Sequence, residues 1–142
     1  MKNKSKLGYT AGVFDMFHIG HLNILEKSKS WCEELIVGVS TDELVHQTKS
    51  HYPIVPFSER IAIIRSLKCV DKAYEQSHSD KRLAHQRFAF DEIFVGDDWK
   101  GSKIWNEYEI YFAKEGVKVT YFPYTINTSS TALRKLIKRK LI

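Results

Sequence analysis

Two histidines lie three residues apart in the segment FDMFHIGH, residues 14–21, directly behind an apolar run. At helical spacing His18 and His21 are about one turn apart, so both imidazoles can face the same ligand. Gly20 and the helix that is expected to follow it offer free backbone N–H groups and the positive end of a helix dipole. This combination indicates a site that stabilises charge on a phosphoryl group during its transfer. A zinc pair and ordinary packing are the alternatives, although neither a nearby cysteine nor a His-Glu-x-x-His helix supports zinc.

Three further polar segments are expected near the histidines. Lys49 lies in a long loop after the second expected strand, the start of which can form a helical turn. The acidic segment GDDW (96–99) ends the fourth strand, and YTINTSST (124–131) follows the fifth. Ligands of open parallel sheets bind outside the carboxyl ends of the strands, near the point where strand order reverses. The segments therefore predict one phosphate-binding edge, with Lys49 as a mobile cation. The remaining histidines carry no motif and are expected on the surface; these are His46, His51, His78 and His85.

Alternating strands and helices are expected to position these segments. Apolar and β-branched runs predict strands, and apolar residues at helical spacing predict helices. The expected strands lie within residues 7–13, 34–41, 70–75, 91–99 and 117–124, and the expected helices within residues 21–31, 58–67, 78–90, 104–116 and 129–139. Ser58 is the expected N-cap of the second helix. The alternation predicts an α/β fold, a single Rossmann-like, doubly wound parallel sheet with helices on both faces.

The composition restricts the class of protein. With 142 residues, 43% of them hydrophobic and 27% charged, the chain is expected to form one domain over residues 1–142, with residues 1–6 as a flexible basic tail. No apolar run reaches the roughly 18 residues of a membrane helix, and the start lacks a signal-peptide core, so we expect a cytoplasmic protein without membrane insertion. Cys32 and Cys69 fit no metal or redox spacing and are expected to be free thiols. Despite a net charge of +5, no motif indicates binding to nucleic acid.

Four motifs carry a resemblance to a known family. GVFDMFHIGH, STDE, GDDWKG and TSSTALR occur in this order between about Tyr9 and Leu136. In these motifs the chain resembles the cytidylyltransferase-like nucleotidyltransferases, and among them most strongly the enzymes that act on glycerol 3-phosphate. The resemblance implies transfer of CMP from CTP to a small alcohol phosphate, with pyrophosphate as leaving group and Mg²⁺ on the triphosphate. It also implies a homodimer, and a product that is a precursor for a surface polymer.

The resemblance also assigns roles to residues. His18 and His21 would stabilise the pentavalent α-phosphate, Lys49 would close over the phosphates, and Lys81 is a candidate for binding the acceptor phosphate. Residues that would line or contact the nucleotide are Val13, Phe14, Arg60, Asp97, Asp98, Ser129, Ser130 and Thr131. A carboxylate of the acidic pair can accept from an exocyclic amine of the base. From the residues alone, Arg60 could equally be a surface arginine, and the Ser/Thr cluster a plain helix cap. No metal ligand is assigned.

One departure from the family concerns the triphosphate. Where related cytidylyltransferases carry Arg-Thr-Glu-Gly-Ile before Ser-Thr-Thr, this chain has YTINT, so Tyr124 stands in place of an arginine that is expected to touch the triphosphate. Arg134, one turn into the following helix, compensates only if it reaches back. An adenylyltransferase that uses ATP remains an alternative. A non-catalytic nucleotide-binding protein is another, and the presence of both motif histidines and Lys49 disfavours it.

Overall fold

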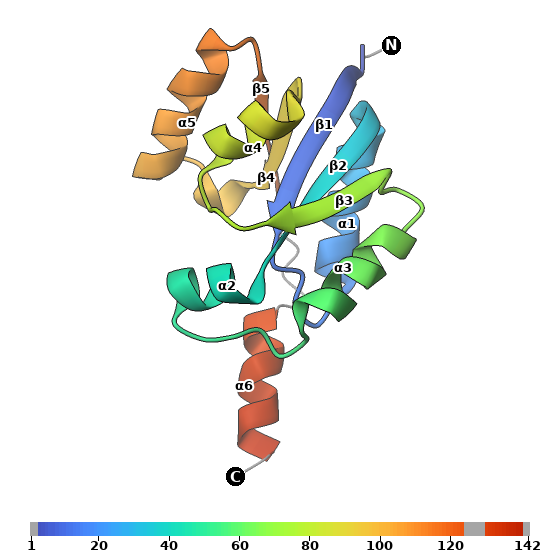
Figure 1. The fold of residues 1–142 in the computed structure, drawn as a ribbon, viewed down its shortest axis with the longest axis vertical. Helices are drawn as coiled ribbons and strands as arrows, with labels where there is room; N and C mark the ends of the chain where they lie inside the picture. The colour runs from blue at the N-terminus through green and yellow to red at the C-terminus, as the bar shows by residue number, and fades with distance from the viewer. Residues whose placement is uncertain (1–2, 124–129, 141–142) are drawn as a thin grey trace.

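The computed structural model describes residues 3–123 and 130–140. Its strands form one parallel sheet in the order β3-β2-β1-β4-β5 (Figure 1). They are β1 (Ser5–Gly12), β2 (Cys32–Ser40), β3 (Lys72–Gln76), β4 (Glu92–Gly96) and β5 (Lys118–Phe122). The chain winds outward from β1 to β3 on one side and from β4 to β5 on the other, so strand order reverses between β1 and β4. The predicted doubly wound parallel sheet is confirmed.

Helices cover both faces of this sheet, as the sequence predicted. They are α1 (Ile19–Ser30), α2 (Asp42–Lys49), α3 (Phe57–Ser66), α4 (Lys81–Phe88), α5 (Lys103–Lys114) and α6 (Ser130–Lys140). Leu25 of α1 and Ile64 of α3 are buried in one hydrophobic core, whereas Trp105 and Phe112 of α5 are buried in a second. Figure 1 shows α6 projecting from the end of the sheet at which the strand arrows point. Among the described residues, no helix is long and apolar enough to cross a membrane.

Strand β2 forms because it is apolar on both sides. Its residues alternate between the two cores, with Val37 and Val39 in the core under α1 and α3, and Ile36 in the core under α5. A strand covered on both faces needs such a continuous aliphatic run. Gly38 interrupts the run where the ring of Tyr9 crosses the strand, since a Cβ atom there would lie 2.1 Å from the Tyr9 hydroxyl oxygen.

Three local expectations were wrong. β1 begins at Ser5, because Ser5 N–H donates to the Trp31 carbonyl and pairs the strand with β2, so residues 5 and 6 do not belong to a flexible basic tail. Lys49 is the last residue of helix α2 and does not lie in a loop; the Thr41 hydroxyl caps this helix by accepting from Leu44 N–H at 3.1 Å. Helix α3 begins directly after Pro56, so Ser58 is not its N-cap.

Candidate active site

A cavity of about 900 Å³ opens at the carboxyl ends of β1 and β4, where strand order reverses. Most of the residues that the sequence assigned to the site line it, namely Val13, Phe14, His18, His21, Lys49, Asp98, Ser130 and Thr131. Arg60, Asp97 and Lys81 are not part of its wall. Tyr124 and Ser129 lie outside the described residues. The expected convergence of distant segments on one edge of the sheet is thus confirmed for the described part of the chain.

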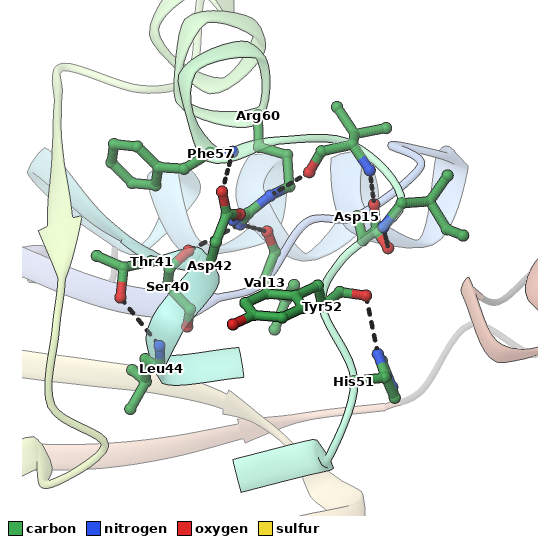
Figure 2. Close-up of polar contacts among 12 residues, drawn as sticks. Val13, Asp15, Ser40, Thr41, Asp42, Leu44, His51, Tyr52, Phe57 and Arg60 are labelled. Carbon is green, nitrogen blue, oxygen red and sulfur yellow. Dashed lines mark hydrogen bonds and ion pairs between the residues drawn. The ribbon is translucent and has the colours of Figure 1, made fainter. Parts of the chain in front are cut away.

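Asp15 holds the turn between β1 and α1 in place. Its carboxylate is buried and accepts hydrogen bonds from Ile54 N–H at 2.8 Å and Val55 N–H at 2.9 Å, as Figure 2 shows. Phe14 and Met16, on either side of it, have positive φ angles of 56° and 49°, a backbone conformation that costs energy and persists only where neighbouring contacts fix it. The Asp15 contacts therefore tie the histidine turn to the segment between α2 and α3.

The two motif histidines form one stacked unit at the N-terminus of α1. His18 is the N-cap, and its Nδ1 accepts from Gly20 N–H at 3.0 Å; His21 Nδ1 accepts from His18 N–H at 3.3 Å. Their ring centroids are 3.9 Å apart. Because Nδ1 is an acceptor in both rings, each neutral imidazole carries its proton on Nε2. Both residues line the cavity, so the pair offers two N–H donors to an anion beside a helix N-terminus.

The environment keeps both imidazoles neutral. Burial is the largest of the effects that lower the pKa of His21 to about 4; electrostatic interactions with His18 and Lys49 act in the same direction, while Asp15 opposes them. Burial also lowers the pKa of His18. A second proton on either ring would also displace a backbone donor from Nδ1, since a protonated Nδ1 cannot accept. The pair therefore provides hydrogen-bond donors at neutral pH without a formal charge.

Helix α6 supplies a cation to the same cavity. Arg134 Nη2 donates to Asp15 Oδ2 at 2.7 Å, and the Ser130 hydroxyl donates to the Asp15 carbonyl at 2.6 Å. Arg134 thus reaches back to the site, which the sequence left open. Its Nε–H group is buried without a hydrogen-bond partner among the described residues, although Arg134 lines the cavity. A buried, unsatisfied donor on a cationic side chain is a strong candidate for contact with an anionic ligand.

The charges around Asp15 influence one another. Burial lowers the pKa of Lys49, and so does the charge of Arg134, whereas Asp15 raises it. Burial alone would raise the pKa of Asp15, but the hydrogen bonds from Val55 and Ile54 and the pairing with Arg134 outweigh it, and the pKa falls. At Asp15 one carboxylate therefore faces two cations, so this part of the described cavity wall has a local excess of positive charge for a polyanion.

Arg60 does not contact the cavity, and its expected place in the nucleotide site is corrected. The side chain is 1% exposed and donates four hydrogen bonds, to the carbonyls of Val55, Val13 and Ser40 and to Asp42 Oδ1, at 2.7–2.8 Å (Figure 2). Four of the five N–H groups of the guanidinium are thereby satisfied. Arg60 joins the ends of β1 and β2 to the segment before α3. Its role is therefore to fix the backbone next to the cavity.

Asp97 and Lys81 also lie away from the cavity wall. Asp97 begins a short 3₁₀ turn, Asp97–Trp99, and this turn brings Asp98 and Trp99 to the cavity in its place. Lys81 is the first residue of α4, and its Nζ lies 3.4 Å from Gln76 Oε1. Burial lowers the pKa of Lys81 to about 8, against an opposing effect of Asp80.

Sequence reasoning missed several residues of the cavity wall, among them Asp15 and His51. Asp15 could have been found, because a carboxylate between two apolar residues directly before the histidine pair is unusual for a buried turn. His51 was expected on the surface, yet it lines the cavity with Lys49. Nothing in its own neighbourhood in the sequence marks it, since its position follows from the tether between Asp15 and residues 54 and 55.

The site combines a neutral histidine pair, the cations Lys49 and Arg134, and helix N-termini at the switch point of a parallel sheet, which are features typical of α/β proteins that bind phosphate groups. Comparison with known proteins specifies the class further. A family model described as cytidylyltransferase-like matches residues 9–136. The glycerol-3-phosphate cytidylyltransferase of Bacillus spizizenii is 35% identical over 129 residues, which cover 89% of this chain and 92% of that protein. The FAD synthase of Thermococcus onnurineus is 33% identical over 132 residues, covering 90% and 86%.

A solved structure agrees with these relatives. The lipopolysaccharide core biosynthesis protein from Thermoplasma volcanium superimposes with a TM-score of 0.71 at 28% identity, over 87% of this chain and 99% of that one. The chain belongs to the cytidylyltransferase-like family of nucleotidyltransferase enzymes.

Proposed function

We propose that this enzyme transfers CMP from CTP to a small alcohol phosphate, with glycerol 3-phosphate as the first candidate, and releases pyrophosphate. The observation that carries the proposal is the stacked pair His18 and His21 at the N-terminus of α1: both residues line the cavity, and both rings carry their proton on Nε2. The name of the Bacillus relative supports CTP and glycerol 3-phosphate.

The geometry suits an in-line displacement at the α-phosphorus. An acceptor phosphate oxygen attacks, the bond to the bridging oxygen of pyrophosphate breaks, and negative charge accumulates on the equatorial oxygens. The two neutral imidazoles would donate to those oxygens from fixed positions, which stabilises the transition state without reorganisation. Lys49 and Arg134 would hold the β- and γ-phosphates, and the Arg134 Nε–H group would gain the acceptor that it lacks.

Two bases, cytosine and adenine, fit the carboxylate that is available in the cavity. Asp98 lines the cavity and has no partner among the described residues, so its carboxylate is available to accept from an amine of the base. Cytosine N4 and adenine N6 both offer such an amine. ATP is therefore the second candidate nucleotide, and the similarity to an FAD synthase favours it, because the product in that name contains an adenylyl group.

Magnesium is proposed as a companion of the triphosphate. No group of three His, Cys, Asp or Glu side chains among the described residues could hold a metal ion. Asp15, the buried carboxylate of the cavity, is already occupied by three donors. Mg²⁺ commonly retains several waters and binds through substrate phosphates, so its ligands here would be triphosphate oxygens and water. Bound in that way, the ion would neutralise charge on the leaving group.

Lys81 is proposed as a residue that binds the acceptor. It lies after β3 and therefore at the same carboxyl edge of the sheet. Its ammonium group forms no ion pair with another described residue. A lysine with a lowered pKa and an amide as its only described hydrogen-bond partner is a candidate for a functional role. Lys81→Gln should raise the KM for the acceptor and leave the KM for the nucleotide unchanged, whereas the exposed control Lys72→Gln should alter neither.

The test is pyrophosphate release in the presence of Mg²⁺, with CTP or ATP offered against a panel of acceptors led by glycerol 3-phosphate. Release that requires CTP and one acceptor supports the proposal and names the substrate. Release that requires ATP would show that the nucleotide is ATP and not CTP. Absence of nucleotide binding, measured by calorimetry, contradicts the whole proposal.

A further inference from the structure

His51 lies in the cavity wall on the segment that follows α2. The segment is held at two places: Ile54 and Val55 donate to Asp15, and the Tyr52 ring stacks on His46 with centroids 4.3 Å apart. His51 itself is half-buried. Its ring is oriented by a contact between Nδ1 and the Tyr52 carbonyl oxygen at 3.1 Å, which Figure 2 shows.

This contact gives His51 the opposite tautomer to the motif pair. A carbonyl oxygen can only accept, so His51 Nδ1 must carry a proton. In the neutral ring Nε2 is then a free lone pair, and it can gain a proton without loss of any contact. His18 and His21 cannot do so, because their Nδ1 atoms are already acceptors for backbone N–H groups. Of the three imidazoles in the described cavity wall, His51 alone can cycle between its two charge states with the fold unchanged.

The position of His51 in the cavity wall, near Lys49 in the chain, is what we expect of a residue beside the leaving group. His18 and His21 are at the start of α1, where the α-phosphate is proposed to bind. Lys49, two residues before His51, and Arg134 of α6 provide the cations for the β- and γ-phosphates. His51 shares the segment of Lys49 and so is expected on the pyrophosphate side of the α-phosphorus.

We propose that His51 is a catalytic proton donor to the departing pyrophosphate, an inference that rests on the proposed function. As the acceptor oxygen bonds to the α-phosphorus, the bond to the bridging oxygen breaks and that oxygen keeps the electron pair. The proton on His51 Nε2 passes to the pyrophosphate, the ring becomes neutral with its Nδ1–H still on the Tyr52 carbonyl, and solvent returns the proton after product release. Such proton transfer contributes about 10²- to 10⁴-fold to a rate.

Several charged groups share the cavity and bear on this proton. Lys49 from α2 and Arg134 from α6 disfavour a cationic imidazole, and Asp15 from the turn before α1 favours it. His18 and His21 remain neutral, Asp98 after β4 contributes negative charge, and Glu26 and Lys27 of α1 contribute one charge of each sign. The bound triphosphate adds the largest negative charge and therefore favours the protonated ring in the complex.

The test compares wild type with His51→Gln, whose side-chain amide can still donate to the Tyr52 carbonyl. His78→Gln is the matched control, since His78 is exposed and outside this cavity. In wild type and the control, kcat for pyrophosphate release should decline toward alkaline pH, because the proton-donating form of the complex is lost. His51→Gln should lose that alkaline decline and turn over about 10²-fold more slowly, with little change in nucleotide Kd.

Leaving-group basicity separates proton donation from a structural role. Two nucleotide analogues with a methylene or a difluoromethylene bridge between the β- and γ-phosphorus release bisphosphonates of high and low basicity. The deficit of His51→Gln should be smaller with the difluoromethylene analogue, because a less basic leaving group needs no proton. An equal deficit with both analogues, or an unchanged alkaline limb in an active His51→Gln enzyme, overturns this inference alone. Absence of nucleotide-dependent pyrophosphate release from wild type overturns the proposed function and this inference together.

Discussion

Replacement of Arg60 by methionine should destabilise the fold and leave the chemistry of the folded fraction intact. The change removes a fully buried guanidinium and strands four acceptors: the carbonyls of Val13, Ser40 and Val55, and the Asp42 carboxylate. Removal of one partner of a buried ion pair costs about 3–5 kcal/mol, because the other partner is left desolvated. The Asp42 side chain is 31% exposed and can regain some hydration, while the stranded carbonyls add to the cost.

We therefore expect Arg60→Met to lower the free energy of unfolding by about 4 kcal/mol, out of the 5–15 kcal/mol typical of a domain. For a chain of this length the corresponding fall in Tm is roughly 15 °C. Urea unfolding followed by tryptophan fluorescence measures the change directly, since the chain has three tryptophans.

Arg65→Met is the control within the same helix. Arg65 is exposed and donates only to the Ala73 carbonyl, so its loss should cost less than about 1 kcal/mol. The reasoning is refuted if Arg60→Met stays within about 1 kcal/mol of wild type and instead abolishes nucleotide binding, because the guanidinium would then contact the ligand and not the protein.

Three other changes follow from the structure. The folded pKa of His21 is about 4 against 6.5 unfolded, so the free energy of unfolding should rise with pH between these values, by at most about 3 kcal/mol, and His21→Gln should flatten the rise in urea titrations at a series of pH values. Arg134→Gln should weaken nucleotide binding by roughly tenfold or more in calorimetry, whereas its exposed neighbour Lys135→Gln should change it less than about twofold. Gly38→Ala should cost about 2 kcal/mol in thermal unfolding, since its Cβ would strike the Tyr9 hydroxyl; a variant as stable as wild type would show that Tyr9 can move aside.

The sequence predicted what depends on local pattern. The aliphatic run of β2 is typical of a strand covered on both faces, and the histidine spacing predicted two rings at the start of one helix; the structure has both. The same local reasoning failed for Arg60 and His51. From the segment SER alone, Arg60 could be exposed to solvent or buried. It is buried because its guanidinium donates to carbonyls at positions 13, 40 and 55, which the neighbouring sequence does not reveal. His51 reaches the cavity only because Asp15, 36 positions earlier, fixes the chain beside it, and no periodicity reports such a contact.

The contacts of Asp15 also bear on the order in which the molecule forms. Through its backbone carbonyl and its carboxylate, Asp15 is joined to the last described helix, at separations of 115 and 119 residues, whereas β1 and β2 pair through a short crossover. Closing so long a loop costs more entropy than local pairing, and contacts of this kind form late in folding. The sheet should therefore assemble first, and the cavity should be completed only when α6 docks. In hydrogen exchange, the amides of Ile54 and Val55 should then open more readily than those of β2, so the chain would lose its site well before it loses its fold.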